Sequence, residues 1–124
     1  MCEINPVLIE PSAVTATTVF PVIGVENAEK VTFMFTRANH SSGSSAFTVD
    51  GSVDGTTFVG INTLIDNVTN TNGQDLTRVA TATLSSNTSK IYALDLGNFN
   101  YKEIRVTVTE TTDGTHSYKA LIEY

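Results

Sequence analysis

The amino-acid sequence predicts an all-β fold, an antiparallel two-sheet β-sandwich preceded by an extended N-terminal arm. Three observations predict it. Apolar and polar residues alternate in several short segments, which is the period of a half-buried strand. Asp-Gly pairs, which favour tight turns, fall between such segments. No segment carries the cap and apolar stripe of a helix, and a jelly roll and an immunoglobulin-like Greek key fit the strand spacing equally well.

The first eleven residues differ from the rest of the chain. Pro6 and Pro11 bracket three consecutive apolar residues, Val7, Leu8 and Ile9. Because proline cannot donate to a sheet ladder, we expect residues 1–11 to form an extended arm or an edge strand. The arm packs either on a neighbouring subunit or on its own domain, and the sequence favours neither. Residues 12–124 then form one sandwich domain, which suits a chain of 124 residues.

Eight segments are expected to form the strands of this domain. They are rich in β-branched residues, and in chain order they are residues 13–20, 31–36, 47–53, 57–62, 76–84, 90–96, 103–110 and 118–124. Alternation is clearest in the second, third, seventh and eighth. In the second, Phe33 and Phe35 face the core and Met34 faces outward. In the eighth, Tyr118 faces the core and Leu121 faces outward.

The third segment and the turn after it predict a hairpin. Phe47, Val49 and Val53 are expected on the core side of that segment. Asp54-Gly55 follows it and favours a tight turn into the fourth segment, and Asp113-Gly114 predicts the same kind of hairpin between the last two strands. Polar loops are expected at residues 39–45 and 67–75.

Charge and composition exclude several kinds of partner. The net charge is −6, and the seven Lys and Arg residues are never adjacent. Binding to nucleic acid or to an anionic membrane needs clustered cations, so we expect neither. The N-terminus lacks the basic and apolar regions of a secretory signal peptide, so we expect synthesis in a cytoplasm without export by that route.

The candidate catalytic and metal-binding residues form no recognisable site. His40 lies in a Ser-rich loop without a nucleophile motif, and His116 is expected to be an exposed polar residue on a strand. With one cysteine and two histidines far apart, we expect no metal, no cofactor and no enzymatic activity. Tyr92, Phe99 and Tyr101 either close the core or form a platform for a sugar ring.

The surface pattern predicts an interface instead of a reactive site. The residues expected to contact a partner are apolar but lie in the arm or on outward positions of strands: Val7, Leu8, Ile9, Met34 and Leu121. Residues 13–25 carry no charge, and an uncharged segment at a sheet edge attracts another chain unless it is covered. The alternative is that both sheet faces are packed within the domain.

Residues 47–58, which read FTVDGSVDGTTF, resemble a phrase common in virion proteins of tailed bacteriophages. There a strand ending in GS-x-DGT-x-F leads through a hairpin to the next strand, and residues 76–79, 90–96 and 101–106 continue in the same style. The resemblance covers residues 45–124. It implies a capsid decoration, or cement, protein that binds the major capsid protein and copies of itself, commonly as a trimer, within virions assembled in the host cytoplasm. A tail or baseplate component and a carbohydrate-binding sandwich module are the alternatives.

Overall fold

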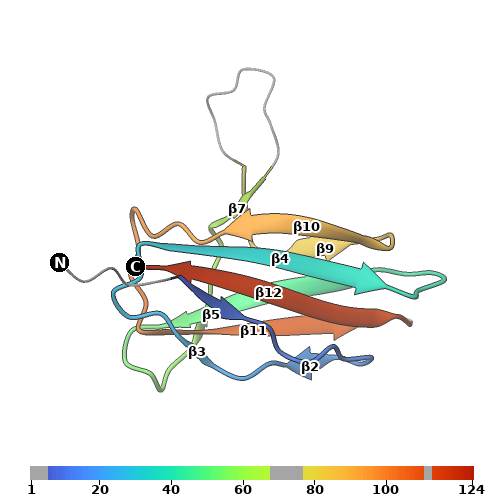
Figure 1. Cartoon of the computed structure of the whole chain (residues 1–124), viewed down its shortest axis with the longest axis horizontal. Coiled ribbons are helices and arrows are strands. Elements are labelled where there is room, and N and C mark those ends of the chain that lie inside the picture. The colour runs from blue at the N-terminus through green and yellow to red at the C-terminus, as the bar shows by residue number, and fades with distance from the viewer. Residues whose placement is uncertain (1–5, 68–76, 111–112) are drawn as a thin grey trace.

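Four long strands form the centre of the fold, shown as a computed structural model in Figure 1. They are β4 (Lys30–Ala38), β5 (Ser45–Ser52), β11 (Glu103–Glu110) and β12 (Thr115–Glu123). Every second side chain along each of them is buried, as the alternation in the sequence predicts. The four most clearly patterned segments are therefore confirmed as strands.

The structure describes residues 6–67, 77–110 and 113–124. Within these ranges the shorter strands are β1 (Val7–Ile9), β2 (Thr18–Val19), β3 (Ile23–Gly24), β6 (Val59–Gly60), β7 (Leu64–Asp66), β8 (Arg78–Val79), β9 (Ala82–Leu84) and β10 (Thr88–Ala93). No helix occurs in them. Residues 1–5 of the expected arm and most of the expected loop at residues 67–75 lie outside the described ranges.

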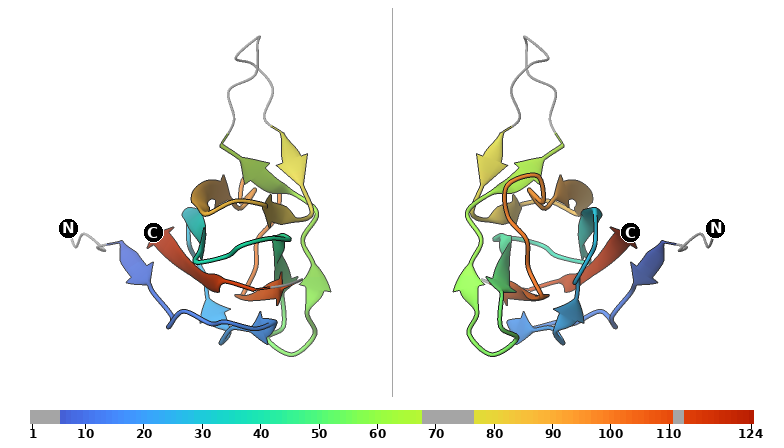
Figure 2. Two further views of the ribbon diagram at one scale, coloured as in Figure 1. Left: turned by 90° about the vertical axis from the view of Figure 1, so that its right-hand side faces the viewer. Right: turned by 90° about the vertical axis from the view of Figure 1, so that its left-hand side faces the viewer.

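The strands form two antiparallel sheets packed face to face, and Figure 2 shows these layers end on. Sheet A has the order β1-β12-β4-β10-β7-β8, and sheet B has the order β2-β11-β5-β6, with β3 also paired to β11 and β9 to β5. The predicted two-sheet β-sandwich is confirmed. Residues 7–9 of the expected arm form an edge strand of sheet A that pairs with β12 of the same chain.

The last two strands correct the hairpin expected at Asp113-Gly114. β11 pairs with β5 in sheet B, whereas β12 pairs along its whole length with β4 in sheet A. The turn at Gly114 therefore crosses between the layers and does not join neighbouring strands. Gly114 adopts a φ of 120°, so the local preference for positive φ was predicted correctly and only the pairing was wrong. Turn residues report local backbone geometry, whereas the partner of a strand depends on burial across the whole domain.

The expected hairpin at Asp54-Gly55 does form and joins β5 to β6. The Asp54 carboxylate accepts hydrogen bonds from the backbone N–H groups of Thr56 and Thr57, both at 2.8 Å, and Gly55 takes a φ of 81°. Val53 was expected to face the core, and this is wrong: the strand ends at Ser52, and the Val53 side chain is 77% exposed in the turn.

Aromatic rings join the two sheets across the core. Phe35 of sheet A stacks on Phe47 of sheet B with ring centroids 4.6 Å apart. Tyr118 of sheet A meets Phe20 edge-on at 4.9 Å, and burial raises the pKa of Tyr118 to about 12. Since such contacts add to the energy of apolar burial, they hold the layers in one arrangement.

Candidate interaction surface

Four apolar side chains gather on the outer face of sheet A. Leu8 of β1 lies opposite Leu121 of β12, and both point away from the core. Met34 of β4 lies opposite Ile91 of β10, on the same side of the sheet. Together with Thr32, the cross-strand partner of Leu121, these residues line a shallow hollow of about 200 Å³. We call Leu8, Met34, Ile91 and Leu121 the outer apolar face.

The charged side chains beside the outer apolar face come in pairs of opposite sign, and Glu123 and Lys30 are cross-strand partners on the same side of the sheet. Lys119, the cross-strand partner of Met34, forms an ion pair with Glu10 at 3.2 Å. Further along the sheet the hydroxyls of Thr36 and Ser89 hydrogen-bond to each other at 2.8 Å. Covering this area therefore removes mainly apolar and hydroxyl groups from water, which is much less costly than burying ions.

The structure brings together three of the five residues predicted as an interface. Leu8, Met34 and Leu121 belong to the outer apolar face, and their contact with a partner stays a prediction. Val7 and Ile9 point to the other side of β1, because successive side chains of a strand alternate. Ile9 packs against the core, and Val7 lies in a groove. Ile91 also belongs to the outer apolar face but was not among the predicted interface residues.

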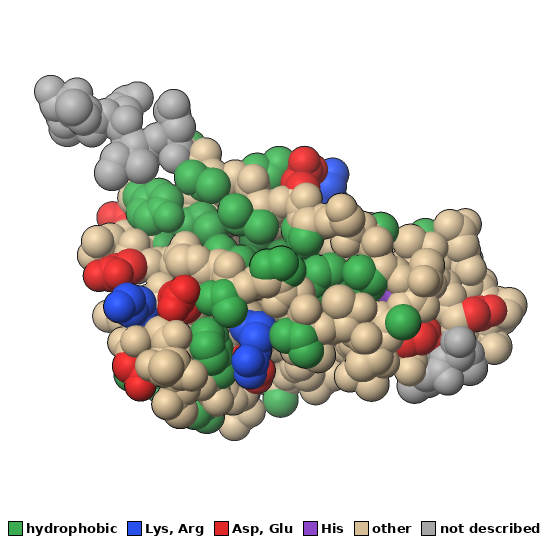
Figure 3. All heavy atoms as spheres, turned by 90° about the horizontal axis from the view of Figure 1, so that it is seen from below, with side chains coloured by type: hydrophobic (Ala, Val, Ile, Leu, Met, Phe, Trp, Pro, Cys, Tyr) green, Lys and Arg blue, Asp and Glu red, His purple; other side chains and the backbone are tan. Residues whose placement is uncertain are grey.

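A lateral groove separates the free edges of the two sheets. β1 of sheet A and the segment from Pro21 to Gly24 of sheet B line it, with Tyr124 at one end, and its volume is about 430 Å³. Figure 3 looks onto the side of the molecule that carries β2 and β3, where hydrophobic side chains are numerous. The uncharged residues 13–25 thus contain two edge strands, as the sequence suggested.

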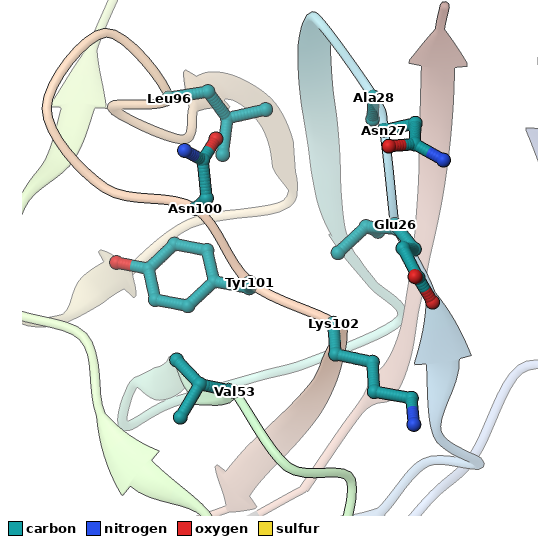
Figure 4. A pocket seen from close by; sticks show the side chains of 9 residues that line it. Glu26, Asn27, Ala28, Val53, Leu96, Asn100, Tyr101 and Lys102 are labelled. Carbon is teal, nitrogen blue, oxygen red and sulfur yellow. The ribbon is translucent and has the colours of Figure 1, made fainter.

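The loops at one end of the sandwich enclose two adjoining hollows of about 590 Å³ each. Val53 and Tyr101 line both hollows. We call the two hollows together the loop-end cleft. Figure 4 shows the first hollow, with Tyr101 and Val53 on one side and Glu26 on the other. Phe99 lines the second and is about half exposed.

The three aromatic residues considered as a sugar platform do not stay together. Tyr92 is buried in the core, where its ring contacts that of Phe35 at 5.7 Å. Phe99 and Tyr101 both line the loop-end cleft. Tyr92 lies on a strand at an inward position, so the alternation of β10 decides its place, whereas the other two lie on the loop between β10 and β11.

The two histidines lie near the opposite end of the sandwich. His116 is fully buried and contacts the Glu110 carboxylate, so the expected exposed position is wrong. Its backbone pairs with Arg37, which is also buried. The hydroxyl of Ser41 hydrogen-bonds to Asp113 at 2.6 Å, while the His40 imidazole lies 3.4 Å from the Arg37 guanidinium.

The hydrogen bonds of Ser41 lower the pKa of Asp113. This arrangement fixes a loop and does not place the Ser41 hydroxyl against an imidazole. Among the described residues no three His, Cys, Asp or Glu side chains lie close enough to hold a metal ion. The same residues include no helix long and apolar enough to cross a membrane.

Comparison with known proteins establishes the fold and no family. No protein-family model matches the chain, and no curated protein matches it. A crystal structure of the SPBc2 prophage-derived protein YomS has the same fold, with a TM-score of 0.69 over 95% of this chain and 92% of that one. The sequences are 13% identical, so the likeness concerns the backbone arrangement.

Proposed function

We propose that this chain is a non-enzymatic structural protein of a virion, and more specifically a capsid decoration protein that binds and stabilises an assembled phage head. The observation that carries the proposal is the outer apolar face. Its side chains come from four adjacent strands, so a rigid sheet holds them, and the neighbouring Lys119 is already engaged by Glu10.

Two likenesses support a place in a virion. Residues 47–58 resemble a phrase of tailed-phage virion proteins, and these residues form most of β5 and the loop that leads to β6. The fold is similar to that of a prophage-derived protein over nearly the full length of both chains. Neither likeness identifies a partner, so the attachment to a shell is argued from the surface itself.

The size of the outer apolar face indicates attachment in several copies. Fully burying one large apolar side chain contributes about 1.5 to 3 kcal/mol, and these side chains are already partly covered, so each contributes about 1 kcal/mol. Four of them sum to about 4 kcal/mol, so one copy binds no more tightly than a dissociation constant of about 1 mM even before the cost of association is subtracted. Linked copies bind far more tightly than one, which is why we propose an oligomer, a trimer in the first instance, on the major capsid protein.

Virions of the phage that encodes the chain provide the test. Mass spectrometry of purified particles should detect the chain, and immunogold labelling should place it on the head. Gold confined to the tail would assign it to the tail or baseplate, and its absence from particles would refute the virion proposal.

A matched pair of variants tests the surface. Leu121→Asp places a charge in the outer apolar face, while Val19→Asp places one on an exposed valine of sheet B, away from that face. We expect particles to lose the first variant during gradient sedimentation and to keep the second. Equal retention would show that attachment uses another surface. Thermal unfolding of both variants checks that each is folded.

A further inference from the structure

The loop-end cleft is the part of the molecule that the proposed attachment surface does not use. It lies between the β3–β4 turn, the β5–β6 loop and the β10–β11 loop. Loops at the end of a rigid sandwich are a common place for binding residues. Each hollow has a volume of about 590 Å³, within the usual range for ligand sites.

Tyr101 is held in a fixed position between the two hollows. A Cβ atom added to Gly51 would come within 2.5 Å of the Tyr101 ring, so the ring lies directly against the backbone of β5. The Tyr101 hydroxyl hydrogen-bonds to the side chain of Thr63, and burial raises its pKa. A ring held at both ends loses little conformational freedom when a ligand packs on it.

Exposed apolar side chains extend this surface. Phe99 is 47% exposed and Val59 is 67% exposed, and both line the second hollow. Neither belongs to the hydrophobic core. An apolar ligand face can therefore pack on Phe99 without any rearrangement of the sandwich.

Neutral amide and hydroxyl side chains make up most of the polar lining of the cleft. Asn62 lines the second hollow and Asn100 the first, and both are exposed. A side-chain amide both donates and accepts hydrogen bonds, which matches hydroxyl groups that do the same. Glu26 and Lys102 provide one charge of each sign in the first hollow, and the second hollow contains the Asp54 carboxylate, so the cleft does not favour an anionic ligand.

The acidic side chain of the second hollow, Asp54, accepts hydrogen bonds from residues of its own turn. Asp54 Oδ1 accepts hydrogen bonds from two backbone N–H groups and from the hydroxyl of Ser52, and these bonds lower the pKa of Asp54 to about 2. Its role is to hold the β5–β6 loop, and the wall that carries Val53 is thereby fixed. Recognition is left to the aromatic and amide groups.

We propose that the loop-end cleft binds an uncharged oligosaccharide of a few residues. The apolar face of one sugar ring packs on Phe99 and the fixed Tyr101 ring, and amides such as Asn62 and Asn100 hydrogen-bond to its hydroxyls. The proposal does not depend on the virion role, because the outer apolar face takes no part in it.

The test uses immobilised hexasaccharides of glucose, galactose, mannose and N-acetylglucosamine as probes for the full chain, followed by NMR titration in solution. We expect at least one to bind with a dissociation constant below about 1 mM. Phe99→Ala should weaken that binding at least about tenfold, which is about 1.4 kcal/mol. Asn62→Ala should weaken it as well.

Two further variants complete the design. Ile91→Ala removes a comparably exposed apolar side chain from the outer apolar face and should leave binding unchanged. Gly51→Ala should displace the Tyr101 ring and weaken binding, with amide NMR spectra confirming that the sandwich is intact. Binding of no uncharged hexasaccharide, or equal effects of Phe99→Ala and Ile91→Ala, would overturn the proposal. Either result would leave the proposed attachment to a virion standing.

Discussion

Arg37 allows a sharp test of what holds one end of the sandwich together. Its side chain points inward from β4 and is 1% exposed. The guanidinium donates to the carbonyls of Ser42 and Gly43, both at 2.8 Å, and more weakly to those of Leu84 and Asp113, both at 3.4 Å. One cation thus joins two loops and the end of β9. We predict that Arg37→Met, which keeps the bulk and removes the donors, destabilises the protein.

The magnitude follows from the two short bonds. A hydrogen bond from a charged donor contributes about 1.5 to 3 kcal/mol, so the carbonyls of Ser42 and Gly43 account for about 3 to 6 kcal/mol. Arg37 Nε is buried without a hydrogen-bond partner in the described residues, and removing it recovers about 1 kcal/mol. The net loss is about 2 to 5 kcal/mol, or about 8 to 20 °C in Tm for a domain of this size.

Urea titration followed by circular dichroism gives the free energy of unfolding of each variant. Arg105→Met is the matched control, since the Arg105 side chain is 34% exposed, lies over the Phe58 ring and pairs with Asp50 at 2.9 Å. Exposed pairs of this kind contribute about 1 kcal/mol or less. Equal or greater stability of Arg37→Met would refute the reasoning, because the cost of removing the guanidinium from water would then exceed the value of its hydrogen bonds.

Four further predictions concern other parts of the fold. His116→Ala removes a fully buried imidazole together with its contact to Glu110 and should cost about 3 to 5 kcal/mol in urea titration, whereas a loss below about 1 kcal/mol would show that the site collapses around the smaller side chain. Gly55→Ala places a Cβ at a φ of 81° and should cost about 1 kcal/mol; no loss would mean that the turn relaxes. Because the pKa of Asp54 is lowered from 3.8 to about 2, the stability it gives is complete above pH 4 and is lost as the pH falls through 2, and an NMR titration midpoint near 4 would contradict the hydrogen bonds to its carboxylate. Because the pKa of Tyr118 is raised from 10 to about 12, its contribution to stability is complete below pH 10 and is lost as the pH rises through 12. Ultraviolet titration should therefore show one tyrosine that ionises only as the protein unfolds.

The long strands could be predicted from the sequence because alternation is a local signal. It placed Phe33, Phe35 and Met34 on the correct sides of β4. The same alternation continues to Arg37, which also faces inward. The prediction stopped before it, because a charged side chain is not expected at a buried position. The prediction that His116 is exposed was wrong for the same reason. Both are held by contacts with distant loops or strands, which the pattern of one segment does not reveal.

The short strands and the pairing were less accessible. β3, β6 and β8 have two residues each, too few to show a period, and they exist because longer neighbours offer free hydrogen-bonding edges. For the surface, Leu8, Met34 and Leu121 could be proposed from the sequence, while Ile91 was missed. Its neighbour Tyr92 is a core residue, so the alternation of β10 would have placed Ile91 on the outer side of the strand.

The position of β12 between β1 and β4 has a consequence for how the protein is made. Among the described strands, β1 and β4 come early in the chain and both pair with β12, so neither has all its neighbours until β12 has been synthesised. Until then the rings of β4 and the edge of that strand are open to other chains, and pairings between strands distant in the sequence form slowly. Nascent chains stalled before residue 115 should therefore remain protease-sensitive, and folding should begin only as the final strand emerges.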